Sequence, residues 1–290
     1  MRVCPAQEVN HRTSLMIEIK NLTKRFGDFT AVDHLTVDIK DGEFFGLLGP
    51  NGAGKTTTIS MISTVLLPTD GEIRLDGAVL DRKAHKEKRK ISIVTQEFSM
   101  RQDMTMEEIM EYQGRLYYLP KEEIRRKTEE LFSFSGLIEY RKRTVRHLSG
   151  GMKRKLMICR ALLTEPEIIL LDEPTAGMDA LSRRQMWSLL REMKKNDITI
   201  LLTTHYMEEA EALCDRVAFI NKGSLKKIGI PKDLIRELGS YTVETEDDNG
   251  IRYDHFKEKK EALLFIENAG ENAVMRATAL EDVFVHEVGK

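Results

Sequence analysis

The spacing of hydrophobic positions along the chain predicts both strands and helices. Apolar and polar residues alternate in Met16–Ile19, as they do in a strand with one buried face. Apolar residues run without interruption in Phe44–Leu48 and Ile168–Leu171, which is typical of strands buried on both faces. The predicted strands of the main body are residues 16–19, 35–39, 44–48, 91–94, 168–171, 198–203 and 216–220.

Apolar residues three or four positions apart predict helices between these strands. The predicted helices are residues 55–66, 106–119, 121–134, 155–163, 182–195 and 207–213. Buried strands that alternate with helices indicate an α/β fold with a mainly parallel sheet. The charged, Met-rich region over about residues 97–156 is helical almost throughout, so we expect a helical insertion between strands.

The pattern changes after about residue 238, where a small α+β unit is expected to extend to residue 290. Two predicted helices, at residues 257–268 and 280–286, flank a predicted strand at 273–278. The run Asp247-Asp248-Asn249-Gly250 predicts a hairpin turn. We therefore expect a loose tail over residues 1–15, a large domain over 16–238 and a small unit over 239–290.

Composition narrows the class of protein. Hydrophobic residues make up 41% and charged residues 32%, which is the balance of a globular protein. The formal net charge of −2 gives no overall attraction to nucleic acid, so no nucleic-acid partner is expected. No apolar run approaches the ~20 residues of a membrane span, and residues 1–15 lack the apolar core of a signal peptide. The chain is therefore expected in the cytoplasm, and any work at a membrane would go through a partner.

A glycine-rich loop after the strand at 44–48 carries the clearest chemistry. It matches the P-loop pattern G-x-x-x-x-G-K-[ST], with an apolar strand before it and a helix after it. The glycines let successive backbone N–H groups face phosphate oxygens, and the start of the helix adds a favourable dipole. Lys55 supplies a positive charge to the phosphates, and the Thr56 hydroxyl is placed to reach Mg²⁺. The candidate nucleotide-binding residues here are Gly49, Pro50, Asn51, Gly52, Ala53, Gly54, Lys55, Thr56 and Thr57.

Two further segments suit the same chemistry. The strand at 168–171 ends in Asp172, a carboxylate suited to Mg²⁺, and Glu173, which is one residue further on and suited to polarising a water. Ser149-Gly150-Gly151 precedes the predicted helix at 155–163, where the serine can cap the helix and the glycines allow an anion to approach. Taken alone, the first segment is also compatible with a solvated strand end and the second with an ordinary helix start.

In this order, the three segments resemble the nucleotide-binding domains of ABC transporters. Leu148–Met152 is similar to the family's signature motif, although Met152 stands where many members have Gln. Gln96 matches the Q-loop glutamine, Ala176–Asp179 the D-loop and His205 the switch histidine. Phe26 matches the aromatic residue that stacks on adenine, although a lone Phe in a turn is also often part of a core. The resemblance covers about residues 16–234.

The resemblance implies a P-loop NTPase core of the RecA-like type with an antiparallel β subdomain. It implies that Asp172, Thr56 and Gln96 hold Mg²⁺, that Glu173 activates water, and that His205 completes the catalytic site with Lys55 and Gln96. It also implies two such domains packed head to tail, with ATP bound by one P-loop and capped by Ser149, Gly150 and Gly151 of the other copy. The second copy would be identical or a paralogue, and a polytopic permease would hold the pair at the inner face of the membrane.

The branch of the family and the class of function remain to be chosen. The Met152 variant and the tail segment Leu280-Glu281-Asp282-Val283-Phe284 resemble the branch that exports drugs and polysaccharides. The alternative is a soluble ABC ATPase that acts on a ribosome or on DNA. The ribosomal type usually has two sets of motifs and the DNA-repair type a long coiled coil, and this chain has one set and no sustained heptads. A non-catalytic sensor would be expected to lack Glu173 or His205, and both are present.

Overall fold

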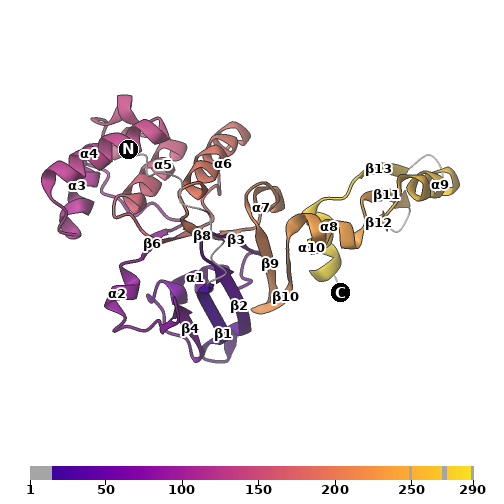
Figure 1. Cartoon of the computed structure of the whole chain (residues 1–290). Coiled ribbons are helices and arrows are strands. Elements are labelled where there is room, and N and C mark those ends of the chain that lie inside the picture. The colour runs from indigo at the N-terminus through magenta and orange to yellow at the C-terminus, as the bar shows by residue number, and fades with distance from the viewer. Residues whose placement is uncertain (1–14, 248–249, 270–272, 289–290) are drawn as a thin grey trace, which may run out of the picture.

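The computed structural model describes residues 15–247, 250–269 and 273–288. Three sheets organise these residues, and two of them form the main body (Figure 1). The strands are β1 (Leu15–Phe26), β2 (Phe29–Lys40), β3 (Phe44–Leu48), β4 (Asp70–Leu75), β5 (Ala78–Val79), β6 (Ile91–Val94), β7 (Ile168–Asp172), β8 (Thr199–Thr204), β9 (Arg216–Asn221), β10 (Ser224–Gly229), β11 (Tyr241–Asp247), β12 (Gly250–Phe256) and β13 (Ala273–Ala277).

The helices fill the connections between these strands. They are α1 (Lys55–Ile62), α2 (His85–Lys88), α3 (Met106–Leu116), α4 (Lys121–Ser135), α5 (Gly150–Leu162), α6 (Ala180–Lys194), α7 (Met207–Leu213), α8 (Pro231–Leu238), α9 (Lys259–Ala269) and α10 (Leu280–Val288). Two 3₁₀ turns, at Ile138–Tyr140 and Val145–His147, lie between α4 and α5. The predicted α/β fold with a helical insertion is therefore confirmed.

The central sheet has the strand order β10-β9-β3-β8-β7-β6. All its pairs are parallel except β9–β10, so the expectation of a mainly parallel sheet holds. Successive residues of β7 enter different cores: Ile169 and Leu171 pack with the helical insertion, while Ile168 and Leu170 pack toward the antiparallel sheet. This two-sided burial explains the uninterrupted apolar run in the sequence. Because β3, β8 and β7 are neighbouring parallel strands, their carboxyl ends lie at one edge of the sheet.

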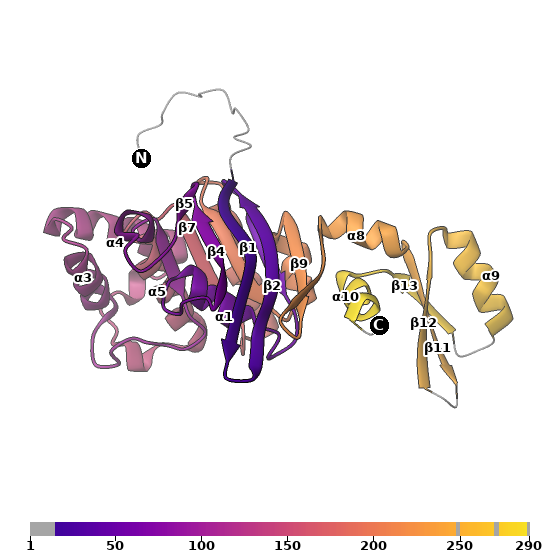
Figure 2. The same cartoon turned by 90° about the horizontal axis from the view of Figure 1, so that it is seen from below.

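The second sheet, of order β2-β1-β4-β5, is antiparallel and covers one face of the main body (Figure 2). β1 and β2 are 12 residues each, much longer than the predicted strands. Shifts in the β1–β2 register after Ile19 and after Leu22 interrupt the alternation that the sequence prediction relied on.

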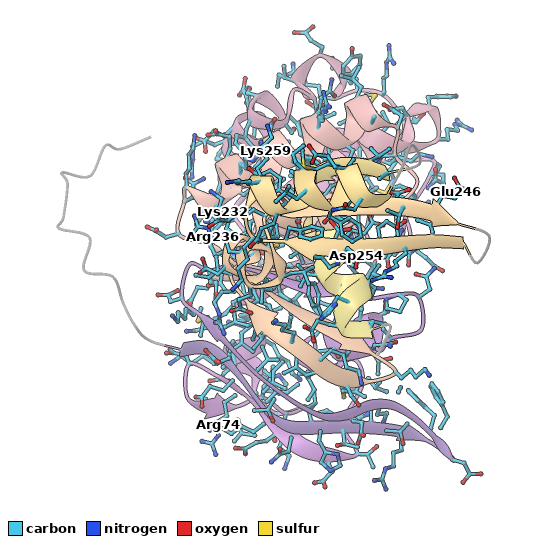
Figure 3. All side chains as sticks on the ribbon, turned by 90° about the vertical axis from the view of Figure 1, so that its right-hand side faces the viewer. Arg74, Lys232, Arg236, Glu246, Asp254 and Lys259 are labelled. Carbon is cyan, nitrogen blue, oxygen red and sulfur yellow. The ribbon has the colours of Figure 1, made fainter. Side chains whose placement is uncertain are left out.

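The third sheet, of order β12-β11-β13, belongs to the small C-terminal unit, which Figure 3 shows facing the viewer with Glu246 on β11 and Lys259 on α9. Helix α10 returns to the main body and buries Leu280 and Val283 in a cluster that also contains Met207 and Phe219. Residues 1–14 of the expected tail, and Asp248 and Asn249 of the predicted turn, lie outside the described residues. The domain boundaries at 238/239 and over about 97–156 remain predictions.

Candidate active site

The P-loop joins β3 to α1 by a tight turn that only glycine allows at two positions. Gly54, at the start of α1, has φ +104°, and a Cβ on it would lie 2.4 Å from the Ala31 carbonyl oxygen. A Cβ on Gly49 would lie 2.2 Å from the carbonyl oxygen of Ile220. The glycines thus let the loop pass against neighbouring backbone, and the first N–H groups of α1 remain available to an anion.

Lys55 is the positive charge of this loop, and its position is fixed. Its side chain is only 4% exposed, and Nζ donates to the carbonyl oxygens of Gly49 (2.9 Å) and Pro50 (3.1 Å). Nζ also lies 3.3 Å from Glu173 Oε1. The ammonium group is therefore held between the loop and the end of β7.

Asp172 ends β7 beneath the loop, and two hydroxyls orient its carboxylate. Thr56 Oγ1 lies 3.2 Å from Asp172 Oδ1, and Thr203 Oγ1, at the end of β8, donates to the same oxygen at 2.5 Å. These oxygen donors suit Mg²⁺, which takes few protein ligands and keeps several waters. Within the described ranges, no group of three or more His, Cys, Asp or Glu side chains is arranged to hold a metal.

Glu173 has an unusual backbone conformation that directs its side chain into the site. Its φ is +47°, in the left-handed region that non-glycine residues rarely adopt, and its N–H donates to the Thr203 carbonyl at 3.0 Å. His205, which follows β8, places Nδ1 3.1 Å from Glu173 Oε2. One carboxylate therefore contacts both Lys55 and His205.

A cavity of about 520 Å³ connects these groups. Its walls include most of the residues expected to bind nucleotide or act on it. The expected residues that line the cavity are Asn51, Gly52, Gly54, Lys55, Thr56, Thr57, Gln96, Glu173 and His205. Phe29, Ala31, Ala176, Gly177 and Tyr206 complete the lining.

Some expected residues do not line this cavity. Gly49, Pro50 and Ala53 contribute backbone to the loop, and Asp172 lies below the lining. Phe26 is 49% exposed, with Lys24 Nζ over its ring, and Phe29 lines the wall instead. Ser149, Gly150 and Gly151 are at the start of α5, where Ser149 Oγ accepts from the Met152 N–H at 3.3 Å.

Arg154, beside the cavity, was not predicted as a site residue, because its hydrogen-bond partners are distant in sequence. Arg154 of α5 is 2% exposed and donates to the carbonyl oxygens of Thr95 (2.6 Å) and Gln96 (2.9 Å). Burial lowers the pKa of this guanidinium. The sequence contains one sign of this buried position: an arginine stands where the spacing of α5 places apolar residues. Arg154 links the helix that begins at Ser149 to the backbone beside the cavity.

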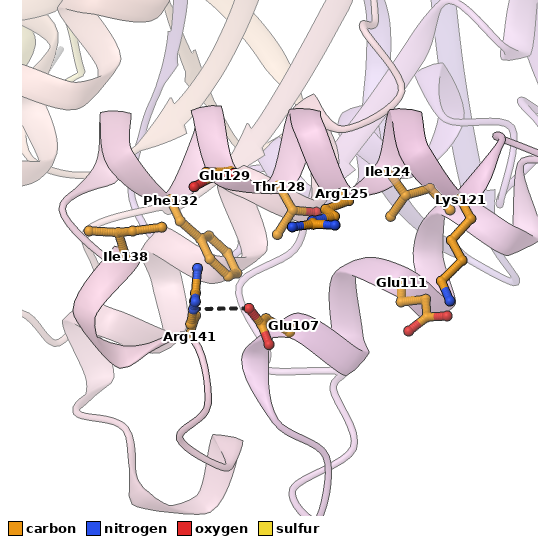
Figure 4. A pocket seen from close by; sticks show the side chains of 10 residues that line it. All are labelled: Glu107, Glu111, Lys121, Ile124, Arg125, Thr128, Glu129, Phe132, Ile138 and Arg141. Atoms are coloured by element: carbon orange, nitrogen blue, oxygen red, sulfur yellow. Dashed lines mark ion pairs between the residues drawn. The ribbon is translucent and has the colours of Figure 1, made fainter.

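A second hollow, of about 380 Å³, lies between α3 and α4 (Figure 4). Its rim carries three acidic side chains and three basic ones, among them Glu107 and Arg141, whose atoms Oε1 and Nε are 3.2 Å apart. It shares no lining residue with the cavity at the P-loop. Because its charges balance and no glycine-rich loop faces it, this hollow does not suit a polyphosphate.

Comparisons with known proteins agree with this geometry. The family model for "ABC transporter" matches residues 32–176. The linearmycin resistance ATP-binding protein LnrL of Bacillus subtilis (strain 168) is 37% identical, over 94% of this chain and 83% of the relative. The Nod factor export ATP-binding protein I of Ralstonia nicotianae is 39% identical, over 81% of this chain and 73% of the relative.

A solved structure shares the fold. It is an ATP-binding cassette in a dimeric, post-hydrolysis state bound to ADP and Pi, and it matches with a TM-score of 0.67 and 28% identity over 74% of this chain and 98% of the other. In the part of the chain that the structure describes, no helix is long and apolar enough to cross a bilayer. The chain belongs to the ABC transporter family, as an ATP-binding and ATP-hydrolysing subunit.

Proposed function

We propose that this chain hydrolyses ATP in the cavity beside Lys55 and thereby drives a separate permease that exports its cargo. One observation carries the proposal: the Glu173 carboxylate, which follows β7, lies 3.3 Å from Lys55 Nζ at the start of α1 and 3.1 Å from His205 Nδ1 after β8. A P-loop for the phosphates and a carboxylate for the water are thus in one cavity.

In this proposal the loop N–H groups and Lys55 bind the phosphates, and Phe26 stacks on the adenine from the rim. Glu173 accepts a proton from a water molecule while the oxygen of that water attacks the γ-phosphorus. The bond between the γ-phosphorus and the β-phosphate oxygen breaks, which releases ADP and inorganic phosphate. His205, which is 3.1 Å from Glu173, orients that carboxylate and donates to the γ-phosphate. Lys55 offsets the charge that develops on the phosphate oxygens.

The donor set of the cavity also fits Mg²⁺. Thr56 Oγ1, the Asp172 carboxylate and the Gln96 amide would hold the ion, which supplies charge neutralisation on the β- and γ-phosphates. Thr203 keeps Asp172 turned toward Thr56 by its 2.5 Å hydrogen bond. A carboxylate held by two hydroxyls needs little reorganisation to bind a hard cation.

The second half of the site comes, we propose, from a second nucleotide-binding subunit. Ser149, Gly150 and Gly151 do not line the cavity of their own chain. Gly150 and Gly151 have no positive φ, and no described atom lies within 4 Å of a Cβ built on Gly150. Its own fold therefore does not require glycine there, whereas close approach to the γ-phosphate of another copy would. A solved ATP-binding cassette that shares the fold is dimeric with ADP and Pi bound, which supports a second subunit.

The exported cargo is suggested by the relatives. Relatives at 37–39% identity are named for linearmycin resistance and for Nod factor export. We propose a drug-like, lipid-like or saccharide-like cargo, which crosses through the permease while this chain stays bound to its cytoplasmic side.

The test is the variant Glu173→Gln, which keeps the size of the side chain and removes the base. It is expected to bind ATP and Mg²⁺ with near wild-type affinity, to lose about 100-fold or more in kcat, and to form an ATP-dependent dimer on gel filtration. Lys55→Ala is the control that loses nucleotide binding. Wild-type turnover in Glu173→Gln would rule out Glu173 as the base.

A further inference from the structure

A buried carboxyl group outside the cavity joins the two loops that line it. Glu209, in the first turn of α7, has no exposed surface. Its Oε1 accepts from Thr175 Oγ1 at 2.9 Å and from Trp187 Nε1 at 3.2 Å. We call Glu209, Thr175 and Trp187 the buried junction.

The three members of the buried junction come from three different segments. Thr175 is two residues after Glu173, in the loop whose Ala176 and Gly177 line the cavity. Glu209 is four residues after His205, at the start of the helix that this histidine precedes. Trp187 is on α6 and is the chain's single tryptophan. A movement of α7 relative to the loop after β7 would therefore change the contact between His205 and Glu173.

The cost of burying Glu209 argues against a role as simple packing. Its second oxygen, Oε2, is buried and has no hydrogen-bond partner among the described residues. Burial raises the pKa of Glu209, although the Thr175 hydroxyl, the Trp187 indole and the charge of Arg183 oppose that rise. The charge of Arg154 also interacts with it. An apolar side chain would fill the same space without this penalty, because an unpartnered buried oxygen is destabilising.

We propose that Glu209 is a positioning residue for ATP hydrolysis. It holds the loop after Glu173 and the helix after His205 in the relative position that keeps Glu173 and His205 in contact. This inference rests on the proposed roles of Glu173 and His205. Glu209 touches neither nucleotide nor water, since it does not line the cavity. Its effect is therefore expected on kcat and not on the binding of ATP.

The experiment measures steady-state ATP hydrolysis of the full chain with Mg²⁺. Glu209→Ala is expected to lower kcat about 10- to 100-fold, with a change in KM of about threefold or less, because misplaced catalytic groups slow the chemical step. The separate variant Glu209→Gln keeps an oxygen acceptor for Thr175 and Trp187, so its kcat is expected to stay within about threefold of wild type. Glu208→Ala, at the neighbouring exposed position of α7, is the matched control and should leave kcat unchanged.

Trp187 supplies a second readout. Addition of ATP and Mg²⁺ is expected to change its fluorescence in the wild type and in Glu209→Gln, and the response should be lost in Glu209→Ala. In a double-mutant cycle with His205→Ala, the two losses in kcat should not add, since Glu209 acts through the His205–Glu173 contact.

A folded Glu209→Ala with wild-type kcat would overturn the proposal, as would fully additive losses in the cycle or failure of Glu209→Gln to keep kcat near that of wild type. If Glu209→Ala does not fold, Thr175→Val tests the same link with a smaller change, and wild-type kcat in that variant also overturns it. A wild-type chain that hydrolyses no ATP would contradict the proposed function and not the buried junction.

Discussion

Individual glycines near the cavity are required for different reasons. The backbone of Gly54 is left-handed, and its Cα hydrogen faces the Ala31 carbonyl, so its own fold excludes a side chain there. Gly150 meets neither condition. Glycine in a helix interior costs about 0.5–1 kcal/mol relative to alanine, and the described part of this chain shows no need for glycine at the first position of α5.

Gly150→Ala separates these reasons experimentally. The free energy of unfolding of the isolated chain is expected to stay the same or rise by about 0.5–1 kcal/mol, because alanine favours the helix. ATP turnover should fall about tenfold or more, since a methyl group would meet the γ-phosphate bound by the other copy. Urea unfolding and steady-state turnover provide the two numbers. Unchanged turnover would contradict the head-to-tail arrangement, and Gly54→Ala, which should lose stability, is the contrast.

At this scale, sequence patterns reach only those residues whose neighbours in space are neighbours in the chain. The P-loop binds through consecutive residues, so its spacing predicts the site. Arg154 and Thr203 act on carbonyl and carboxylate oxygens more than 30 positions away along the chain. Nothing in a local pattern specifies such a pair. The pairing of β7 with β8 brings Thr203 to Asp172, and the packing of α5 against β6 brings Arg154 to Thr95.

Whole elements follow the sequence where one rule dominates. β3, β6 and α7 have the predicted bounds, because an apolar run (β3), β-branched apolar residues broken only by Ser92 (β6) and helical spacing (α7) indicate them directly. Helix α5 begins at Gly150, five residues before the prediction, because its N-cap at Ser149 offsets the low helix propensity of two glycines. β10 was not predicted, since Lys226 and Lys227 conceal its apolar positions.

Helix α10 carries a matched pair of valines that tests its docking on α7. Val283 is 1% exposed and packs in the cluster with Leu48 and Phe219, whereas Val285 is 54% exposed. Val283→Ala is expected to lower the free energy of unfolding by about 2 kcal/mol, since it removes buried methyl groups and leaves a cavity. Val285→Ala should change it by less than about 0.5 kcal/mol. Equal effects in urea unfolding would mean that α10 does not dock as described.

An ion pair between Asp282 of the same helix and Arg276 of β13 makes the stability of the fold depend on pH. Burial alone would raise the pKa of Asp282, but the Arg276 guanidinium (two contacts of 2.7 Å) and the Ala279 N–H hold it below its usual value. A carboxyl group whose pKa is lower in the folded than in the unfolded chain stabilises the fold above the unfolded pKa, and this contribution is lost as pH falls through the folded pKa.

Asp282→Asn is therefore expected to be less stable than wild type at pH 7, by on the order of 1 kcal/mol, and the difference should shrink below about pH 4. Urea unfolding at a series of pH values from neutral to acid measures it. A difference that does not depend on pH would show that the pair contributes through shape and not through charge.

At the scale of the whole molecule, α1, whose first residues line the cavity, and the C-terminal unit lie on different parts of an elongated body (Figures 1 and 2). No helix within the described ranges is long and apolar enough to span a bilayer. Three tyrosines of the helical insertion, Tyr112 in α3 and Tyr117 and Tyr118 just after it, have exposed side chains.

Affinity capture of the Glu173→Gln chain from detergent-solubilised membranes, with ATP present, tests the assembly. A polytopic membrane protein is expected among the captured proteins, because ATP-bound closure would hold the complex together. Lys55→Ala, treated in the same way, should retain it less strongly. Capture of ribosomal or DNA-repair proteins alone would instead favour a soluble ATPase.

The left-handed backbone at Glu173 sets two demands on this molecule against each other. Glycine would adopt φ +47° without strain, whereas glutamate there costs on the order of 1 kcal/mol or more. Relief of that strain would favour glycine at position 173, but the change would also leave the buried Lys55 ammonium without its anionic partner. A substitution chosen to relax this backbone would therefore delete the carboxylate on which the proposed hydrolysis depends.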